Sequence, residues 1–338
     1  MKAYRLSHGG RIDGLQLHDV EERPLDPHEV RVGVKAVSLN YRDLMVAEGG
    51  YPIKNDTPII PCSDGAGEVL AIGSMVTRVQ PGDRVAASFF PHWFDGQPTQ
   101  EKIASALGGD VDGMLAQAVT LHENTLVKMP DQLSYQEAAT LPCAAVTAWN
   151  GLFESSHLRP GDTVLLLGTG GVSIFGLQMA KAAGLQVIIT SSSDDKLART
   201  RELGADETIN YRTTPEWQDE VLRLTSGKGV DVVLEVGGEG TINRSIAATA
   251  VGGNIVTIGG VSGFGGEVNP RSLVTSIKRL SGIYVGSRAM LERTAAFIGG
   301  AGIKPVISNV FPFAEAQAAY RHLQSGKHFG KVVIDLTQ

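Results

Sequence analysis

The chain has 338 residues, of which 42% are hydrophobic and 20% are charged, and its formal net charge is −6 at pH 7. This length and composition predict an ordered globular protein that folds as two domains. The acidic balance disfavours nucleic acid as a partner, because a phosphate backbone is bound by clustered positive charge.

The two cysteines, Cys62 and Cys143, are too few for a disulfide framework or for a structural zinc held by four thiolates. The first residues lack the apolar stretch of a secretory signal, and no apolar run is long enough to span a membrane. We therefore expect a cytoplasmic protein with no membrane partner.

The N-terminal part, residues 1 to about 130, is predicted to be rich in β-structure. Short alternating runs such as 29–37 and 65–73 are typical of strands, and residues 80–84 form a turn rich in Gly and Pro. A helix is then expected to start at Ser134, because Ser134 and Glu137 have the spacing of a capping box.

Strands and helices alternate after this point. The apolar run 163–167 is typical of a strand buried on both faces. Further strands are expected at 186–190, 230–236 and 253–259, helices at 171–183 and 194–203, and a last strand at 331–336. Such alternation predicts an α/β fold with a doubly wound parallel sheet.

A glycine-rich loop joins the strand 163–167 to the following helix, which is the context of a dinucleotide site. Gly168 permits a tight turn, and Gly170 has no side chain to block a diphosphate at the positive end of the helix dipole. Ser173 replaces the last glycine of the usual pattern, and we expect a slight helix shift there. The assigned cofactor loop comprises Gly168, Thr169, Gly170, Gly171, Val172 and Ser173.

The residues after the second strand favour NADP(H) over NAD. An NAD site places a carboxylate about 20 residues after the glycines, at the end of that strand. This chain instead has a serine cluster there, and Ser192, Ser193 and Lys196 can bind a 2′-phosphate through hydroxyls, amides and one positive charge. Asp194 and Asp195 are interpreted as acids of the first helical turn, where the helix dipole favours them.

Ordered motifs lie at 40–44, 61–69, 141–149, 168–173, 204–211 and 330–333. Together they resemble the medium-chain dehydrogenase/reductase superfamily, and most closely its quinone oxidoreductase (zeta-crystallin-like) branch. The resemblance implies a Rossmann domain with a doubly wound parallel sheet and a GroES-like β-rich catalytic domain. The predicted limits are 1–130 with 300–338 for the GroES-like domain and 131–299 for the Rossmann domain.

The resemblance also bears on zinc. In the alcohol dehydrogenases of this superfamily, Cys, His and Cys hold the catalytic zinc, and these positions correspond to Asn40, Ser63 and Cys143 of this chain. The Glu that follows the histidine corresponds to Asp64. An amide, a hydroxyl, one thiol and one carboxylate are poor zinc ligands, so we predict no metal. Without a metal to polarise a carbonyl, the favoured acceptors are quinones and α,β-unsaturated carbonyls, in which negative charge is delocalised.

The predicted catalytic residues are Asn40, Tyr41 and Thr147, of which the resemblance places Asn40 and Thr147 near the nicotinamide. Tyr41 either donates to the acceptor oxygen or is a packing aromatic, and both interpretations stay open. Asp43 is interpreted as a structural hydrogen-bond acceptor. Further cofactor contacts implied by the resemblance are Tyr211, Gly237, Ile258, Gly259, Val285 and Lys331.

Two other functions remain open on the sequence: an alcohol dehydrogenase acting on alcohols or aldehydes, and a non-catalytic NADPH-binding sensor or structural protein. The expected partners are a small-molecule substrate and a second copy of the chain. The segment 279–286 is expected to be an edge strand at a twofold axis, or alternatively an internal strand. The physiological substrate does not follow from the sequence.

Overall fold

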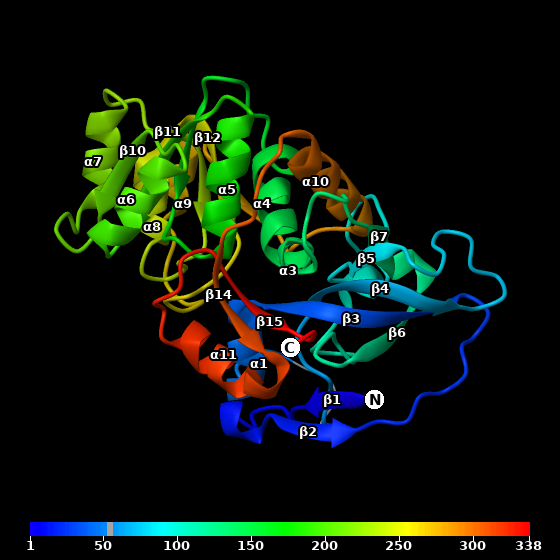
Figure 1. The fold of residues 1–338 in the computed structure, drawn as a ribbon. Coiled ribbons are helices and arrows are strands. Elements are labelled where there is room, and N and C mark those ends of the chain that lie inside the picture. Colours follow the sequence, from blue (N-terminus) through cyan, green and yellow to red (C-terminus); the bar gives the residue numbers. More distant parts are fainter. Residues whose placement is uncertain (53–56) are drawn as a thin grey trace. The chain divides into compact units, whose positions relative to one another are not determined.

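The computed structural model describes residues 1–52 and 57–338. The chain forms two compact units. The first, here called the terminal unit, combines Met1–Val146 with Gly286–Gln338, and the second, the central unit, is Thr147–Val285. Figure 1 labels the elements of both.

The limits of the units differ from the predicted limits of 130/131 and 299/300, because two segments belong to the terminal unit. Helix α10 (Arg288–Gly300) packs against strand β7 (Leu126–Lys128) and against the π-helical turn Leu141–Ala145. Helix α3 (Tyr135–Ala139) packs against the main sheet of the same unit. Packing that the sequence pattern does not reveal therefore sets the boundary.

The terminal unit contains one large sheet, mostly antiparallel, with strand order β14-β15-β3-β4-β5-β7 and with β6 also paired to β3. Alternation of polar and apolar residues along its strands buries one face in the core. A small hairpin of β1 (Lys2–Arg5) and β2 (Gln16–Asp19) lies apart from this sheet. The remaining strands are β3 (Glu29–Leu39), β4 (Asp64–Ile72), β5 (Arg84–Ala87), β6 (Ala118–His122), β14 (Ile307–Pro312) and β15 (Lys331–Asp335).

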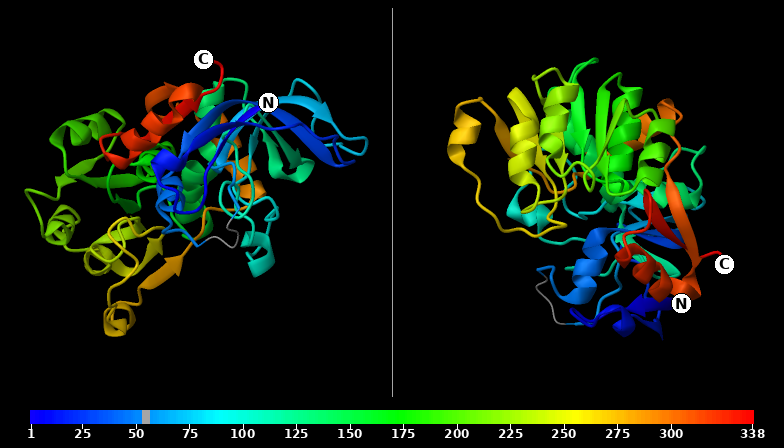
Figure 2. Two further views of the ribbon diagram at one scale, coloured as in Figure 1. Left: turned by 90° about the horizontal axis from the view of Figure 1, so that it is seen from below. Right: turned by 90° about the vertical axis from the view of Figure 1, so that its left-hand side faces the viewer.

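The pairing of β15 with β3 joins a C-terminal strand of the chain to a strand of its N-terminal part. The strands are antiparallel, with Val332 opposite Leu39 and Val333 opposite Ser38. Figure 2 shows the red and orange C-terminal strands beside the blue strand β3. The start of β15 is thereby brought to the end of β3, where helix α1 begins.

The helices of the terminal unit have local signals that the sequence contains. The capping box of α3 is confirmed: Glu137 N donates to Ser134 Oγ over 3.1 Å, and Ser134 N donates to Glu137 Oε2 over 2.7 Å. Helix α1 (Tyr41–Glu48) ends at Gly49, whose φ of 77° suits glycine. The other elements are α2 (Gln100–Ile103), α11 (Ala316–Gln324) and 3₁₀ turns at Ile12–Gly14, Glu123–Thr125 and Phe313–Glu315.

The central unit is built on a six-stranded sheet of order β10-β9-β8-β11-β12-β13, in which all neighbours are parallel. This confirms the predicted doubly wound sheet. The central strands β8 and β11 are apolar because helices cover the sheet. The strands are β8 (Thr163–Leu166), β9 (Gln186–Ser191), β10 (Glu207–Asn210), β11 (Val230–Glu235), β12 (Thr249–Thr257) and β13 (Arg279–Gly282).

Strand order reverses between β8 and β11, since the chain runs outward from β8 to β10 and returns to β11. The loops that follow these two strands diverge there, and open α/β sheets bind ligands at such a point. The helices of the unit are α5 (Gly171–Ala182), α6 (Asp194–Glu202), α7 (Trp217–Leu224), α8 (Ile242–Ala248) and α9 (Pro270–Val274), together with a π-helical turn at Asn150–Glu154. Helix α4 (Val146–Trp149) spans the first boundary between the units.

Within the described residues, no helix combines the length and the apolar character that crossing a membrane requires.

Candidate functional site

The cofactor loop follows β8 as predicted. Gly168 has φ of 73°, a conformation that favours glycine. Among the described residues, nothing lies within 4 Å of where a Cβ atom of Gly168 or Gly170 would stand. Gly170 is the N-cap of α5 and has no side chain to accept from the first amides, which lack acceptors within a helix. The loop therefore has the open, amide-lined form that suits a diphosphate.

Ser173 is accommodated within this helix. Its side chain is buried, and its Oγ donates to the carbonyl oxygen of Leu167 over 2.7 Å. The hydroxyl thus links the first turn of α5 to the end of the preceding strand, a place where the usual pattern has glycine. Thr169 is also buried, and Gly171 and Val172 lie half-buried at the start of α5.

The end of β9 presents hydroxyls and one cation. Ser193 is the N-cap of α6, and its Oγ accepts from the backbone amide of Lys196 over 3.4 Å. Ser192 and Lys196 are half-buried beside it. Burial, and then the positive charge of Arg199, lower the pKa of the Lys196 ammonium. An anion bound near these two cations would relieve their repulsion, as a 2′-phosphate would.

Asp194 has a structural partner, as its position in the first turn suggests. Its carboxylate accepts from Asn210 Nδ2 over 2.8 Å, which ties α6 to the end of β10. Tyr211 follows directly, with its backbone amide bonded to the carbonyl of Ser191 and its side chain 41% exposed. Tyr211 and the serine cluster are therefore neighbours at the ends of adjacent strands.

The second loop at the strand-order reversal is held by a buried carboxylate that sequence reasoning missed. Glu235 ends β11, and its Oε1 accepts from the amide of Gly237 over 2.7 Å and from Thr241 Oγ1 over 2.6 Å. Its Oε2 accepts from Ser245 Oγ. The signal was present in the sequence as an acid at a strand end, followed by two glycines and by hydroxyls six and ten residues on.

The backbone carbonyl of Glu235 also binds the loop after β12. The amides of Ile258 and Gly259 both donate to the backbone carbonyl of Glu235, over 2.8 and 3.4 Å. Three residues predicted to contact the cofactor, Gly237, Ile258 and Gly259, are thus brought together around one strand end. Whether they contact a nicotinamide stays a prediction.

Two other predicted residues of the central unit lie elsewhere in it. Thr147 is buried within α4. Val285 has φ of 51°, which is strained for a β-branched residue, and its carbonyl accepts from Asn150 Nδ2 over 2.8 Å. Their assigned roles at the acceptor and at the cofactor stay predictions.

The terminal unit contains a buried polar cluster around Lys331, and we call it the Lys331 cluster. The Lys331 ammonium donates to Asn40 Oδ1 over 2.5 Å and to the carbonyl of Leu39 over 2.7 Å. Asn40 Nδ2 donates to Ser63 Oγ over 3.4 Å, and Ser63 Oγ donates to Asp64 Oδ1 over 2.7 Å. Asp43 and Cys143 are the other members. The Asp43 carboxylate accepts from the backbone amide of Asn40, and the backbone amide of Cys143 donates to the Asp64 carboxylate.

Burial and neighbouring positive charge shift the pKa values of the two carboxyl groups of the cluster in opposite directions. Burial raises the pKa of Asp43 to about 6, although the neighbouring Arg42 cation opposes this. Burial also raises the pKa of Asp64, and the Lys331 ammonium is the strongest opposing influence. The thiol of Cys143 has a pKa raised by burial and by the charge of Asp64, so it is a neutral, poorly reactive group.

The cluster does not suit zinc. The residues at the four zinc-related positions do meet here, but Asn40 Oδ1 already accepts from an ammonium and Ser63 Oγ already donates to Asp64. The described part of the chain contains no group of three or more His, Cys, Asp or Glu side chains arranged to hold a metal ion. Amide and hydroxyl donors are weak ligands for zinc.

The three predicted catalytic residues differ in accessibility. Asn40 is 8% exposed and both ends of its amide are directed to protein groups. Tyr41, the first residue of α1, is 47% exposed and is free to meet a small molecule. Asp43 accepts from the Asn40 backbone amide over 2.7 Å, which confirms its structural interpretation.

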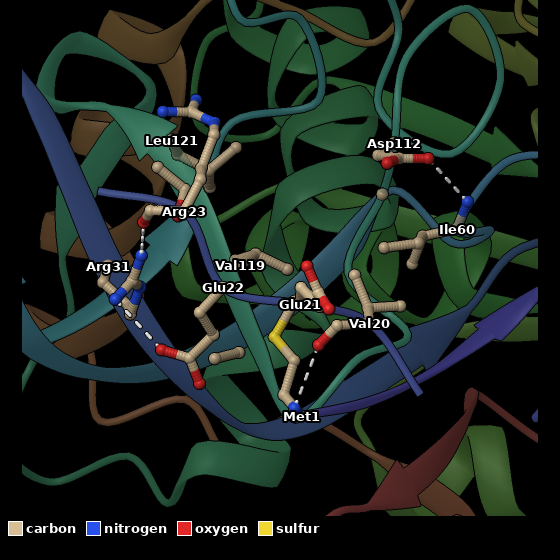
Figure 3. A pocket seen from close by; sticks show the side chains of 13 residues that line it. Met1, Val20, Glu21, Glu22, Arg23, Arg31, Ile60, Asp112, Val119 and Leu121 are labelled. Atoms are coloured by element: carbon tan, nitrogen blue, oxygen red, sulfur yellow. Dashed lines mark hydrogen bonds and ion pairs between the residues drawn. The ribbon is translucent and has the colours of Figure 1, made fainter. Parts of the chain in front are cut away.

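A hollow of about 290 Å³ in the terminal unit does not involve these residues and lies beside β6 and the segment 20–23 (Figure 3). Several of its charged groups already have protein partners: Arg31 pairs with Glu22 over 3.0 Å, and Asp112 accepts from the Ile60 amide over 2.8 Å. Groups that are already paired offer little to a ligand.

Two families match the chain. Residues 26–131 match the alcohol dehydrogenase GroES-like domain, and residues 171–299 match the zinc-binding dehydrogenase domain. A zinc-type alcohol dehydrogenase-like protein of Schizosaccharomyces pombe is 46% identical over 332 residues, 96% of either chain. A quinone oxidoreductase of Pseudomonas aeruginosa is 32% identical, again over 96% of either chain.

Solved structures of similar fold match this chain over nearly its whole length. A putative alcohol dehydrogenase from Sinorhizobium meliloti has a TM-score of 0.92 at 41% identity and covers 99% of both chains. An NAD-dependent alcohol dehydrogenase has a TM-score of 0.91 at 35% identity, covering 99% of this chain and 100% of its own. A 2-octenoyl-CoA carboxylase reductase, in complex with NADP and 2-octenoyl-CoA, has 0.87 at 26% identity, covering 99% and 87%.

Proposed function

Because the chain belongs to the medium-chain dehydrogenase/reductase superfamily, an oxidoreductase family that includes quinone oxidoreductases, we propose that it is a zinc-independent, NADPH-dependent reductase of quinones or α,β-unsaturated carbonyls. The observation that carries this proposal is the Lys331 cluster. An amide and a hydroxyl, those of Asn40 and Ser63, occupy two positions where a zinc site would have Cys and His, and the buried Lys331 ammonium is bonded to Asn40.

The central unit supplies the residues that would hold the cofactor, which delivers hydride when bound. The open glycine loop and the first amides of α5 suit its diphosphate. Ser192, Ser193 and Lys196 suit its 2′-phosphate, because they combine hydroxyls, an N-cap and a cation. The loops around Glu235 present backbone at the strand-order reversal, where such sheets bind nucleotides.

The terminal unit supplies Tyr41 for the acceptor. When an enone gains hydride at its β-carbon, the electron pair of the C=C bond moves toward oxygen, and one proton completes the reduction. The phenol of Tyr41 is exposed and donates to that oxygen in this proposal. Asn40 remains a predicted residue for the acceptor and acts on the position of its neighbours, and the role of Thr147, in the central unit, stays a prediction.

An alcohol dehydrogenase is the second candidate, since two similar structures and one relative have that name. It would have to polarise an unactivated carbonyl without the ligand set for zinc. A non-catalytic NADPH-binding protein is the third candidate, because an open cofactor loop fits it equally well.

The first test is oxidation of NADPH and of NADH, each with 1,4-benzoquinone, 2-cyclohexenone and a simple ketone, with and without a chelator. We expect turnover of the first two acceptors that prefers NADPH and is insensitive to the chelator. Lys196→Ala should reduce the preference for NADPH by about tenfold, the equivalent of one charge-assisted hydrogen bond. Turnover of the ketone alone would favour an alcohol dehydrogenase, and binding without turnover would favour the third candidate.

We also propose that the protein forms a homodimer through β13. This strand ends the sheet of the central unit, so its outer backbone groups are open to another strand. Leu280 on this strand is 40% exposed, and Val251 and Tyr284 nearby in the same unit are 73% and 41% exposed. A monomer by light scattering at assay concentration would contradict the dimer.

A further inference from the structure

Lys331 is held rigidly by its own surroundings. The preceding residue, Gly330, has φ of 78°, and a Cβ atom there would lie 2.3 Å from the carbonyl oxygen of Val306. The backbone amide of Lys331 donates to that same carbonyl over 2.9 Å. The side chain is 3% exposed and belongs to the first residue of β15, which pairs with β3. Its ammonium therefore has a defined position in the interior of the terminal unit.

The ammonium binds the two residues that immediately precede Tyr41. It donates to the carbonyl of Leu39 over 2.7 Å and to Asn40 Oδ1 over 2.5 Å. From the other side, Asp43 Oδ2 accepts from the Asn40 backbone amide over 2.7 Å. Residues 39 and 40 are thus fixed by three hydrogen bonds at the point where β3 ends and α1 begins.

The lysine also settles the orientation of the Asn40 amide. An ammonium has donors only, so the amide must present its oxygen to Lys331 and its Nδ2 to Ser63. Ser63 in turn donates to Asp64, so hydrogen bonds run in one direction from cation to carboxylate. A buried network of this kind is rigid when every member has a partner.

We infer that Lys331 is a positioning residue that acts through Asn40 to fix the start of α1 and, with it, the exposed phenol of Tyr41. Asp43 and Asp64 are the counter-charges of the Lys331 ammonium, and neither end of the Asn40 amide need touch the acceptor. The inference rests on the proposed function for its effect on turnover, but not for its effect on Tyr41.

The most direct test compares two substitutions of Asn40. Asn40→Asp keeps an acceptor for Lys331 but removes the amide donor, whereas Asn40→Ala removes the link to Lys331. We expect kcat to fall in both variants, by about tenfold more in Asn40→Ala than in Asn40→Asp, the value of one hydrogen bond to a charged group. Equal losses in both variants would overturn the inference, because they would make Asn40 itself the donor.

Lys331→Met tests the ammonium, with Lys304→Met as the matched control. Lys304 belongs to the same unit and donates to the backbone carbonyl of Gln132 over 2.6 Å. We expect a lower kcat and an unchanged Kd for NADPH in Lys331→Met only, and no further loss when Tyr41→Phe is added to it. A weaker Kd with unchanged kcat would instead assign Lys331 to the cofactor, and additive losses would remove the link to Tyr41.

A measurement without any acceptor separates this inference from the proposed function. Protein labelled with 3-fluorotyrosine should give a ¹⁹F signal for Tyr41, identified by its loss in Tyr41→Phe. We expect that signal to shift or broaden in Asn40→Ala and Lys331→Met, to change less in Asn40→Asp, and to stay unchanged in Lys304→Met. An unchanged signal in all four variants would overturn the inference even if the enzyme reduces quinones, and a shifted signal would support it even if no acceptor is turned over.

Discussion

The cofactor loop and the Lys331 cluster are both polar sites, but they are built in opposite ways. The loop spans a few consecutive residues between β8 and α5 and owes its form to missing side chains. The cluster draws residues from the ends of β3, β4 and β15, the start of α1 and the turn at 141–145, and most of its polar atoms have a protein partner, although Asp43 Oδ1 has no hydrogen-bond partner among the described residues. The first site is left open for a ligand, whereas the second is closed upon itself.

This difference predicts how each site responds to substitution. An open loop tolerates a new side chain structurally and loses only its ligand, because nothing in the protein has to move. A closed network loses stability or geometry when one partner is removed, because the remaining buried groups are left unsatisfied. Variants of the two sites should therefore separate binding from folding.

The largest expected effect is at the loop. Gly170→Val should raise the Kd for NADPH by at least about 100-fold, equivalent to about 2.7 kcal/mol, while the melting temperature stays close to wild type. The reason is that a Cβ atom at Gly170 meets nothing within 4 Å among the described residues, and the φ of −77° suits any residue. Fluorescence titration with NADPH and thermal denaturation measure the two quantities.

Gly300→Val is the matched control for this prediction. A Cβ atom at Gly300, at the end of α10, also has no described neighbour within 4 Å. We expect it to leave the affinity for NADPH unchanged. A large decrease of the melting temperature in Gly170→Val would show that protein groups pack against the loop. It would contradict the proposed difference between the open loop and the closed Lys331 cluster.

An intermediate effect is expected at the exposed residue that the cluster supports. Tyr41→Phe should lower kcat about tenfold, the value of one hydrogen bond to a developing charge, and should not change the Kd for NADPH. Because the side chain is 47% exposed, the melting temperature should not change. Steady-state kinetics with 2-cyclohexenone measures the effect. Tyr135→Phe, in α3, is the control, and an unchanged kcat in Tyr41→Phe would leave Tyr41 as a surface aromatic.

The smallest effect on turnover is expected at a second closed network, which has no assigned role in the reaction. Glu123 is buried, and its carboxylate accepts from the amides of Thr77 and Arg78 over 2.8 and 3.0 Å and contacts His28 Nδ1 over 2.9 Å. Burial by itself raises the pKa of Glu123, but these donors outweigh it and lower the pKa to about 2. Glu123→Gln should lower the free energy of unfolding by about 1–2 kcal/mol at pH 7, a typical value for bonds to a charged group.

The pH dependence of this difference has a definite sign. A depressed pKa stabilises the fold above the ordinary value of 4.5, and that stabilisation is lost as the pH falls toward 2. The free energies of unfolding of wild type and Glu123→Gln in urea should therefore converge below about pH 4.5. Turnover should be the same in both, and a fall in turnover would mean that closed networks in this unit support catalysis in general.

Much of the central unit could be predicted from the sequence, because its signals are local. The alternation of strands and helices, the glycine loop and the Ser193 cap all depend on residues within one turn of each other. The doubly wound sheet and the membership of the superfamily were confirmed. Glu235 was missed because its partners, Thr241 and Ser245, lie on the following helix and have no motif of their own.

The terminal unit was harder to predict where its two chain segments meet. The pattern indicates a strand at 331–336 but not its partner, so Lys331 was assigned to the cofactor from resemblance alone. The pairing of β15 with β3 places its ammonium against Leu39 and Asn40, 292 and 291 positions away. The boundaries at 146/147 and 285/286 were likewise decided by the packing of α3 and α10.

The sequence by itself determined the elements, the cofactor loop and the unsuitability of Asn40 and Ser63 as zinc ligands, since these depend on residue type and short spacing. Only the tertiary structure decided which groups surround Asn40 and Ser63, because a buried charge acquires its role from the partners that surround it. Lys331, Asn40 and Asp64 come from three distant segments, and their chemistry as a group exists only once the sheet has formed.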